Sequence, residues 1–313
     1  MSVRDFVDIH FRHFNAGALA DCARSLEDFL GSGGRLMVTL AGAMSTAEIG
    51  RSLAPAIRSG MVHAITCTGA NLEEDLFNLV AHNYYERVDW RNHSVEDDLV
   101  LRQRGLNRVT DTCIPEQEAI RKIETHVMDK WQEAIESKET WPASHYLMQV
   151  IDEVEHQAER TDSWLAAAVD MGIPVFTPGW ADSTLGNVFS ARMIQGDVNS
   201  DSIIASDLSE MGRLADWYRS VEAPAGLLQI GGGIAGDFPI CVVPMLRQDI
   251  GEDVPLWAWF AQISESRPSY GGYSGAPPNE KVSWEKLDVD SPKFVIESDA
   301  TIVVPLLLEY VHR

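Results

Sequence analysis

Arg35 to Leu40 reads RLMVTL, a run of apolar and β-branched residues that directly follows a glycine-rich helix stop. Such a run predicts a buried β-strand. The next segment, Ala47 to Arg58, carries Ile49, Leu53 and Ile57 at the spacing of one helix face. We therefore expect a strand followed by a helix near the start of the fold.

The same alternation is repeated downstream. Met61 to Thr66 (MVHAIT) predicts a second strand, and the segment with Leu76, Leu79 and Val80 predicts a second helix. A β-α-β-α opening is typical of a parallel sheet with right-handed crossovers. The predicted fold class is α/β, with a mostly parallel sheet and helices on both of its faces.

Shorter apolar runs extend this pattern over the rest of the chain. Further strands are predicted at Ile173–Phe176, Gly226–Ile230, Val254–Ile263, Phe294–Ile296 and Ile302–Val304, and further helices at His145–Gln157, Ser163–Met171 and Ser202–Ser220. The polar segment 86–125 is predicted to be a long irregular excursion, and 264–286 a Gly/Pro/Ser-rich loop. No linker is evident, so we expect one domain over residues 1–313.

The composition limits the classes of partner. The 313 residues include 47 Asp and Glu against 25 Lys and Arg, a formal net charge of −22. An acidic surface repels nucleic acid and anionic lipid and attracts cations such as amines, although acidity also serves solubility alone. No apolar run is long enough for a membrane span, and the four scattered cysteines suit a reducing compartment. We expect a cytoplasmic protein that binds neither nucleic acid nor membrane.

Three segments lie where a parallel sheet places its ligands, beyond the carboxyl ends of strands. Gly231-Gly232-Gly233 would let a ligand approach the backbone, although a tight turn into a helix is the simpler explanation for the triplet alone. Thr68 to Asp75 (TGANLEED) follows another strand. One explanation for its acidic residues is that they stabilise the positive end of a helix dipole. The alternative is that Glu73 or Glu74 faces a cationic ligand.

The third segment ends in a tryptophan and a lysine. Gly271 to Lys286 is a Gly/Pro-rich loop that runs into Trp284-Glu285-Lys286. Such loops often form lids or binding surfaces, and a lysine becomes a Schiff-base nucleophile when desolvation lowers its pKa. Trp284 could supply apolar cover or hold a cation on its ring. The alternative is that Lys281 and Lys286 are ordinary surface lysines. The nine histidines lack metal-ligand spacing, and no metal is expected.

Together these segments resemble the deoxyhypusine synthase family. The match runs in order over nearly the whole chain, and its N-terminal part is closest to the bacterial deoxyhypusine synthase-like branch. Besides the three segments above, it rests on Asp8–Asn15 (DIHFRHFN), Leu40–Glu48 (LAGAMSTAE), Leu106–Arg108, Pro174–Asn187 and Ser298–Thr301.

The resemblance implies a Rossmann-like fold, NAD as cofactor and, as is usual in the family, a homotetramer. In the family, NAD takes a hydride from a polyamine carbon next to nitrogen, and a lysine in the Trp-x-Lys motif attacks the resulting imine. Diaminopropane leaves when spermidine is the donor. The aminobutyl group then passes to an acceptor amine, and the stored hydride reduces the final imine. The implied activity is NAD-dependent aminoalkyl transfer between amines or polyamines.

Carried over residue by residue, the resemblance makes Lys286 the catalytic nucleophile. The residues implied in binding NAD are Gly42, Ala43, Met44, Ser45, Thr46, Thr68, Gly69, Ala70, Glu74, Asp182, Gly232, Glu265, Ser266, Asp299 and Ala300. The residues implied in the substrate site are Glu73, Glu74, Asn187, Asp237, Tyr273, Glu280 and Trp284.

Three of the substrate positions depart from the family pattern. Asp237 stands where the family has a histidine, and Asn187 and Tyr273 stand where it has amine-binding aspartates. A charge-assisted hydrogen bond to an ammonium is worth about 1.5–3 kcal/mol, so spermidine binding should weaken or the donor should change. A small diamine, as in homospermidine synthesis, is then an alternative acceptor to a protein lysine.

Two other functions stay open. The altered positions are compatible with a non-catalytic NAD- or polyamine-binding homologue, although Lys286 is retained. An NAD-dependent amine dehydrogenase would share the cofactor site but would release NADH without group transfer.

Overall fold

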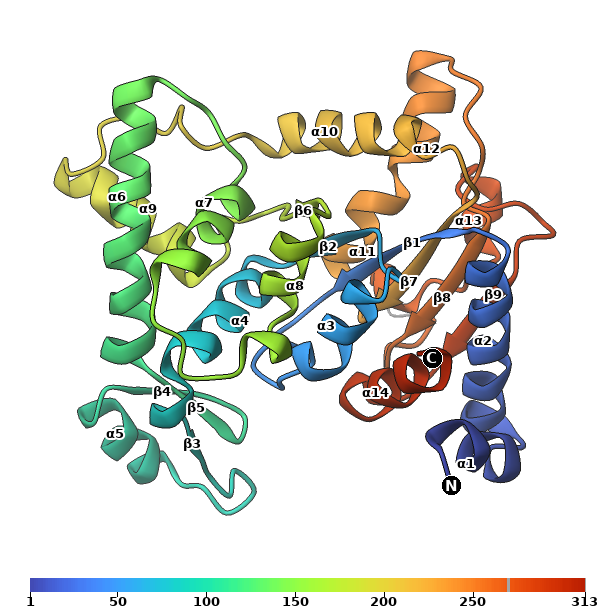
Figure 1. The fold of residues 1–313 in the computed structure, drawn as a ribbon, viewed down its shortest axis with the longest axis horizontal. Coiled ribbons are helices and arrows are strands. Elements are labelled where there is room, and N and C mark those ends of the chain that lie inside the picture. The colour runs from blue at the N-terminus through green and yellow to red at the C-terminus, as the bar shows by residue number, and fades with distance from the viewer. Residues whose placement is uncertain (269–270, 313) are drawn as a thin grey trace.

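The computed structural model describes residues 1–268 and 271–312. Its largest element is a six-stranded sheet in which every neighbouring pair of strands is parallel (Figure 1). In spatial order the strands are β6 (Val175–Phe176), β2 (Ala64–Cys67), β1 (Arg35–Leu40), β7 (Ala225–Ile230), β8 (Trp259–Ile263) and β9 (Lys293–Ile296). Counted along the chain, this is the order 3-2-1-4-5-6 of dinucleotide-binding folds, with the switch point between β1 and β7. The predicted α/β fold class is confirmed.

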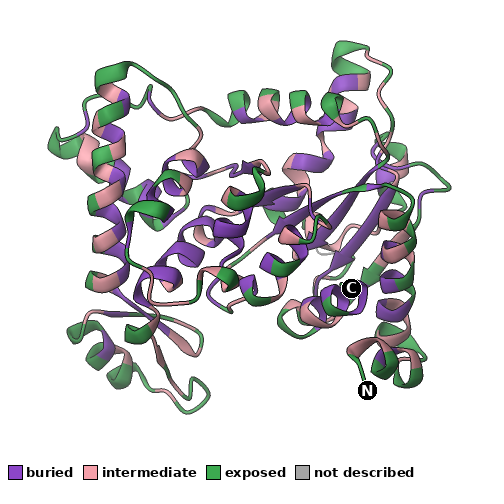
Figure 2. Ribbon diagram, in the orientation of Figure 1, coloured by how far each residue is buried: buried purple, intermediate pink, exposed green. Residues whose placement is uncertain are grey.

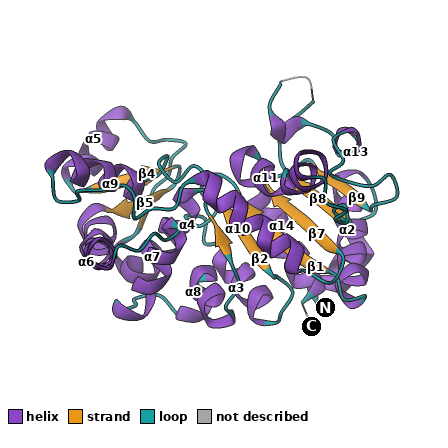
Figure 3. Ribbon diagram, turned by 90° about the horizontal axis from the view of Figure 1, so that it is seen from above, coloured by secondary structure: helices purple, strands orange, loops and turns teal. Residues whose placement is uncertain are grey.

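Helices cover both faces of this sheet, as Figure 3 shows from above. One face packs against α2 (Phe14–Gly31), α3 (Gly50–Arg58), α8 (Trp164–Met171) and α14 (Ala300–Val311). The other face packs against α10 (Asp207–Ser220), α11 (Gly233–Ile240) and α12 (Val242–Pro244).

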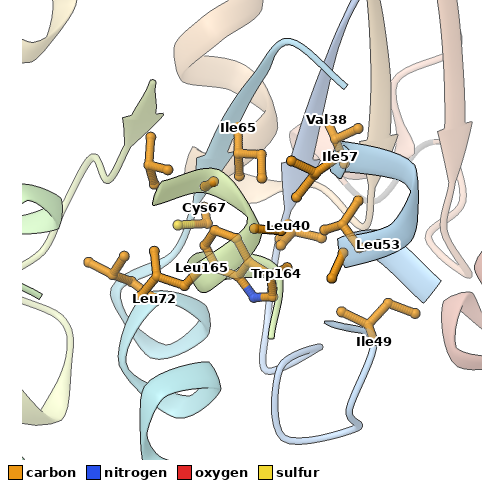
Figure 4. Packing of buried hydrophobic residues seen from close by; sticks show 14 of the residues in the cluster. Val38, Leu40, Ile49, Leu53, Ile57, Ile65, Cys67, Leu72, Trp164 and Leu165 are labelled. Atoms are coloured by element: carbon orange, nitrogen blue, oxygen red, sulfur yellow. The ribbon is translucent and has the colours of Figure 1, made fainter. Parts of the chain in front are cut away.

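The alternation of side chains in β1 divides the core between these two faces. Leu36, Val38 and Leu40 belong to the cluster under α3 and α8, where Trp164 also packs (Figure 4). Met37 points the other way, into the cluster with α10 to α12. Because successive side chains of a strand point to opposite faces, a strand covered on both faces must be apolar at almost every position. This explains why RLMVTL reads as a continuous run, and why the sheet is the buried centre of Figure 2.

A second, smaller sheet lies at the other end of the molecule (Figures 1 and 3). It is antiparallel, with β5 (Thr112–Pro115) between β3 (Glu86–Arg87) and β4 (Leu106–Val109). With α5 (Val95–Gln103) and the start of α6 (Lys122–Ser137), it occupies the segment predicted to be irregular, so that prediction is wrong. The strands have only two to four residues, and those of β3 and β4 are mostly polar and exposed, so such short runs carry no periodic signal.

The remaining helices connect the two sheets. They are α4 (Gly69–Ala81), α7 (Ala143–Val150) and α9 (Thr184–Gln195), while α1 (Val3–His10) packs on α14 and the short α13 (Glu280–Ser283) follows the Gly/Pro-rich loop. Within the described residues, no helix has both the length and the apolar character needed to cross a membrane.

Two predicted strands differ from the structure near the C-terminus. Ile302–Val304 lies inside α14, whose first turn is capped by Asp299 through its bond from the Thr301 backbone nitrogen. Three β-branched residues in a row favour a strand locally, but the apolar run continues for more than two helical turns and packs as a helix. The strand predicted from Val254 is shorter and begins at Trp259, since Pro255 lies in the loop before it.

Candidate active site

A cavity of about 630 Å³ opens at the carboxyl ends of the parallel strands. We call it the strand-end cavity. The loops after all four central strands and the start of α14 contribute to its wall: Ala41, Gly42, Met44, Thr68, Ile230, Gly231, Gly232, Gly233, Ile234, Ile263, Ser264, Glu265, Ser266, Ser274, Asp299 and Ala300. It therefore lies at the switch point, where folds of this strand order bind their ligands.

Two glycines of the triplet after β7 are required by the local geometry. Gly231 has φ of +78°, and a Cβ on it would lie 2.8 Å from the Cβ of Ala41. A side chain on Gly232 would overlap that of Ser274, whose hydroxyl accepts a hydrogen bond from the Gly233 backbone nitrogen at 3.0 Å. The triplet thus lets β1, β7 and the loop containing Ser274 meet at one point.

The opposite wall is fixed by the start of α4. Thr68 is the N-cap, and its hydroxyl accepts from the Asn71 backbone nitrogen and donates to the Gly42 carbonyl at 2.8 Å. The fully buried Asn71 side chain also donates to Gly42 and accepts from the Ser45 backbone nitrogen, each at 2.8 Å. These bonds hold the loop after β1 against the helix. Sequence reasoning did not select Asn71 for the site, because nothing local shows that it bridges to another loop.

The three acids that follow have separate structural partners. Glu73 accepts from the backbone nitrogens of Thr184 and Leu185 at 2.8 Å, so it caps α9. Asp75 accepts from Ser163 at 2.5 Å and from the Leu165 backbone nitrogen at 3.1 Å, so it holds the start of α8. Both oxygens of Glu73, which is predicted as a substrate contact, are thus occupied by a helix end in this structure.

Glu74 differs from its two neighbours in having no helix end to cap. Its carboxylate accepts from the Thr46 hydroxyl at 2.5 Å, behind the loop after β1. Burial raises the pKa of Glu74 to about 7, and the neighbouring charge of Glu73 adds to this. Burial also raises the pKa of Asp75 to about 6, against the hydrogen bonds that favour its charged form. Glu74 can therefore exchange a proton near neutral pH.

A second cavity, of about 730 Å³, contains Lys286; we call it the lysine cavity. Helices α10 to α12 and the π-helix Met245–Ile250 that follows them form one side of it, and the segment 273–286 forms the other. Its lining is Met211, Asp237, Cys241, Pro244, Met245, Gln248, Asp249, Tyr273, Ala276, Glu280, Lys281, Trp284 and Lys286.

Lys286 is held in this cavity by its backbone. Its nitrogen donates to the Lys281 carbonyl and its carbonyl accepts from the Trp257 nitrogen, both at 3.0 Å. Glu285 adopts φ of +53°, a backbone conformation that is strained for residues other than glycine. The chain thus turns sharply after Trp284, and Lys286 is only 8% exposed. The alternative of an ordinary surface lysine is wrong.

The Lys286 ammonium has one carboxylate and two aromatic rings around it. Its Nζ lies 3.4 Å from Asp237 Oδ1 and 5.8 Å from the ring centroids of both Tyr273 and Trp284. Trp284 itself is 63% exposed, so its ring lies at the mouth of the cavity and provides little cover. Tyr273 is turned inward, and its hydroxyl donates to Gln229 Oε1 at 2.9 Å.

The two cavities share a wall. Ser274 lines the strand-end cavity and its neighbour Tyr273 lines the lysine cavity. Helix α11 also reaches both, with Gly233 at its start and Asp237 one turn later. A ligand in the first cavity and an amine in the second would therefore be separated by one turn of chain.

The residues predicted to bind NAD divide into two groups. Gly42, Met44, Thr68, Gly232, Glu265, Ser266, Asp299 and Ala300 line the strand-end cavity. Ala43, Ser45, Thr46, Gly69, Ala70, Glu74 and Asp182 are not part of its lining. Ser45, Thr46 and Glu74 instead form the support behind it.

The predicted substrate residues are also divided. Asp237, Tyr273, Glu280 and Trp284 line the lysine cavity with Lys286. Asn187 lies elsewhere, with Asp182, in a cavity of about 640 Å³ that Arg121 and Arg192 also line. Its amide donates to the Ser183 carbonyl at 2.6 Å. Within one chain, then, the tertiary structure does not bring Asn187 to Lys286.

Lys281 is a cavity residue that sequence reasoning did not select. It is 3% exposed and its Nζ lies 5.1 Å from the Tyr273 ring centroid. The only signal in the sequence that could have selected Lys281 is its position in the same segment as Trp284 and Lys286.

Comparison with known proteins agrees with this architecture. Residues 9–311 match the family model described as deoxyhypusine synthase. A deoxyhypusine synthase-like protein of Nostoc sp. is 31% identical over 99% of this chain and 81% of its own length. A protein of Methanosarcina mazei named probable deoxyhypusine synthase 1 is 26% identical over 96% of this chain and 87% of its own.

A solved structure shows the same fold at much lower identity. A candidate deoxyhypusine synthase from Entamoeba histolytica superposes with a TM-score of 0.61 at 12% identity, covering 99% of this chain and 92% of the other. From the family match and the identity to the Nostoc protein, the chain belongs to the deoxyhypusine synthase family.

Proposed function

We propose that this protein is an NAD-dependent aminoalkyl transferase that acts on a polyamine or related amine through an imine formed on Lys286. The observation that carries the proposal is the position of Lys286: it is buried beside a carboxylate, in a cavity one turn of chain away from the strand-end cavity.

The strand-end cavity has the features that a dinucleotide requires. It lies at the switch point of the sheet, the glycines after β7 expose backbone there, and α11 begins at Gly233 with its amide groups directed to that end. Glu265 and Asp299 are carboxylates of the kind that accept hydrogen bonds from ribose hydroxyls. When bound, NAD would accept a hydride from the carbon next to the amine nitrogen and return it to the final imine.

The residues of the lysine cavity would carry out the transfer. Lys286 attacks the substrate imine carbon as a free amine, so its ammonium must first lose a proton. Asp237, at 3.4 Å, is the carboxylate in reach of that proton. The amine that leaves takes a proton in turn, and the aminoalkyl group stays on Lys286 until an acceptor amine displaces it. Trp284 and Glu280 lie at the entrance, where an incoming ammonium would meet a π face and a negative charge.

The direct test is to trap the imine. The protein is incubated with NAD and either spermidine or 1,4-diaminobutane and is then treated with borohydride. The masses of its peptides are measured by mass spectrometry. We expect a mass increase on Lys286 that requires both NAD and an amine. Absence of an adduct with every amine tried, in protein shown to bind NAD, contradicts the proposal.

Cofactor stoichiometry separates transfer from simple oxidation. In a transferase the hydride returns, so catalytic amounts of NAD sustain turnover and NADH absorbance does not accumulate. An amine dehydrogenase would instead form NADH in proportion to product, and a non-catalytic homologue would give neither result.

We further propose that the functional unit is a homotetramer. The number of copies is what membership of the family implies. The placement of Asp182 and Asn187 in a different cavity from Lys286 within one chain supports a site shared between copies, because a second copy would be needed to bring the two sets together. The tests are native mass spectrometry and complementation. Mixed Lys286→Ala and Asp182→Asn proteins should regain part of the activity that each lacks, whereas a site formed within one chain would gain nothing by mixing.

A further inference from the structure

Among the residues that the structure describes, Lys281 is a buried cation without an anionic partner. It lies on α13, and its Nζ is 4.9 Å from the Phe260 ring centroid and 5.1 Å from that of Tyr273. Within the described part of the chain, its Nζ donates one hydrogen bond, to the Ala276 carbonyl at 3.3 Å. It forms no ion pair with any of residues 1–268 and 271–312, although its side chain lines the lysine cavity. An ammonium has three donors, so two remain for a ligand.

The protein does not neutralise this charge by other means. Burial lowers the pKa of Lys281 to about 8, and the positive charge of Lys286 adds to the effect. The side chain therefore remains mostly protonated at neutral pH. A buried charge without a counter-charge is destabilising, and binding an anion beside it would relieve that cost.

The carboxylates of the cavity are already committed or lie at its mouth. Asp237 pairs with Lys286, whereas Glu280 and Asp249 are exposed. The inner part of the cavity thus carries two lysines against one aspartate. Two of the positions expected to hold an ammonium through carboxylates are Asn187 and Tyr273, which carry no charge.

We propose that the lysine cavity takes a substrate that carries a carboxylate at the end opposite to its reacting amine or imine carbon, and that Lys281 binds this carboxylate. This inference rests on the proposed function, because it assumes that Lys286 forms the imine. It narrows the related amine of the proposed function to an ω-amino acid or an amine derived from one, so that the alkyl group held on Lys286 ends in a carboxylate and not in a second amine. Lys281 is then a specificity-determining residue.

The test uses two aldehydes of equal chain length, 4-oxobutanoate and butanal, which differ in a terminal carboxylate. Each condenses with Lys286 by loss of water, and cyanoborohydride supplies the hydride that fixes the imine as a secondary amine. The rates of labelling at Lys286 are measured on peptides, without NAD or turnover. We expect 4-oxobutanoate to label wild-type protein about tenfold or more faster than butanal, the effect of one charge-assisted hydrogen bond.

Three variants make the measurement specific. Lys281→Met and Lys281→Gln should lose the preference for the carboxylate, measured as the ratio of the two labelling rates within each variant, and continued labelling by butanal shows that the cavity is intact. Lys281→Arg keeps the charge and should keep the preference, which also covers the case in which the neutral variants fail to fold. Equal rates for the two aldehydes in wild-type protein overturn the proposal, as does a preference that survives in the neutral variants.

The outcome is separable from that of the proposed function. Protein that oxidises no amine with NAD but prefers 4-oxobutanoate at Lys286 would refute transfer and retain the anion site. Labelling that falls on Lys281 in place of Lys286 would overturn both roles.

Discussion

The strand-end cavity and the lysine cavity are neighbours, yet they are built differently. The first is made mainly of backbone and small residues at the carboxyl ends of parallel strands, with glycines where β1 and β7 meet. The second is made of long side chains from α10 to α12 and from the segment 273–286. A cavity of the first kind follows from the strand order, whereas one of the second kind follows from individual side chains. If the proposed function holds, the difference implies that cofactor binding depends on the fold and that substrate choice depends on individual side chains.

The largest expected effect is on the nucleophile. Lys286→Ala should lower the transfer rate by roughly a thousandfold or more, because the imine route is removed, while NAD affinity stays the same. Steady-state rates and NAD titration by fluorescence are the measurements. Lys138→Ala, at an exposed helix end, is the matched control and should leave both unchanged. A parallel loss of NAD binding in Lys286→Ala would show that the two cavities are not independent.

The next effect is on stability as a function of pH, through Glu74 behind the strand-end cavity. Its pKa is raised from 4.5 to about 7, so the folded state holds the proton more tightly than the unfolded state does. The free energy of unfolding should therefore fall as pH rises from 4.5 through 7. Glu74→Gln removes the part of this fall that Glu74 causes and leaves the part due to Asp75, so the variant should be more stable than wild type by roughly 3 kcal/mol above pH 7 and similar to it near pH 4.

Urea unfolding at pH 4 to 8 measures this difference. Glu136→Gln, at an exposed position of α6, should leave the wild-type pH dependence unchanged. A Glu74→Gln curve parallel to that of the wild type would contradict the buried, proton-holding state of this carboxyl.

A smaller effect is expected from a substitution in the strand-end cavity that leaves the lysine cavity intact. Gly232→Ala places a methyl group against Ser274, so it should weaken NAD binding by roughly tenfold to a hundredfold while Lys286 is still labelled by butanal. Gly212→Ala is the control, since the exposed helical Gly212 has open space around it and should gain up to about 1 kcal/mol of stability. If Gly232→Ala instead abolished labelling and left NAD affinity intact, the assignment of the two cavities would be reversed.

The smallest effect is expected at the mouth of the lysine cavity. Trp284→Leu removes a ring that is mostly in solvent, so the affinity for amines should fall by only about two- to fivefold. Calorimetric titration with 1,4-diaminobutane measures it, and Trp90→Leu, exposed at the far end of the molecule, should have no effect. A hundredfold loss would mean that the ring closes over the substrate.

Much of the sheet was predictable, because burial on both faces makes central strands apolar at nearly every position. Arg35–Leu40 was predicted with its bounds, and the glycine triplet after β7 marked the cavity edge. The small antiparallel sheet was missed because its strands are too short for alternation to be visible. Ile302–Val304 was misassigned because its local β propensity is overridden by the packing of α14 on α2 and α3.

By itself the sequence determined the apolar runs that become strands, the glycines that permit close approach, and the Trp-x-Lys segment that carries the proposed nucleophile. Only the tertiary structure decided which charges face each other. Glu73 and Asp75 were taken up by helix ends, Glu74 by Thr46, and Lys281 was left buried without a carboxylate. The physical reason is that a strand or a turn is set by neighbours along the chain, whereas the partner of a charge is set by residues far away in sequence that folding brings within a few ångströms.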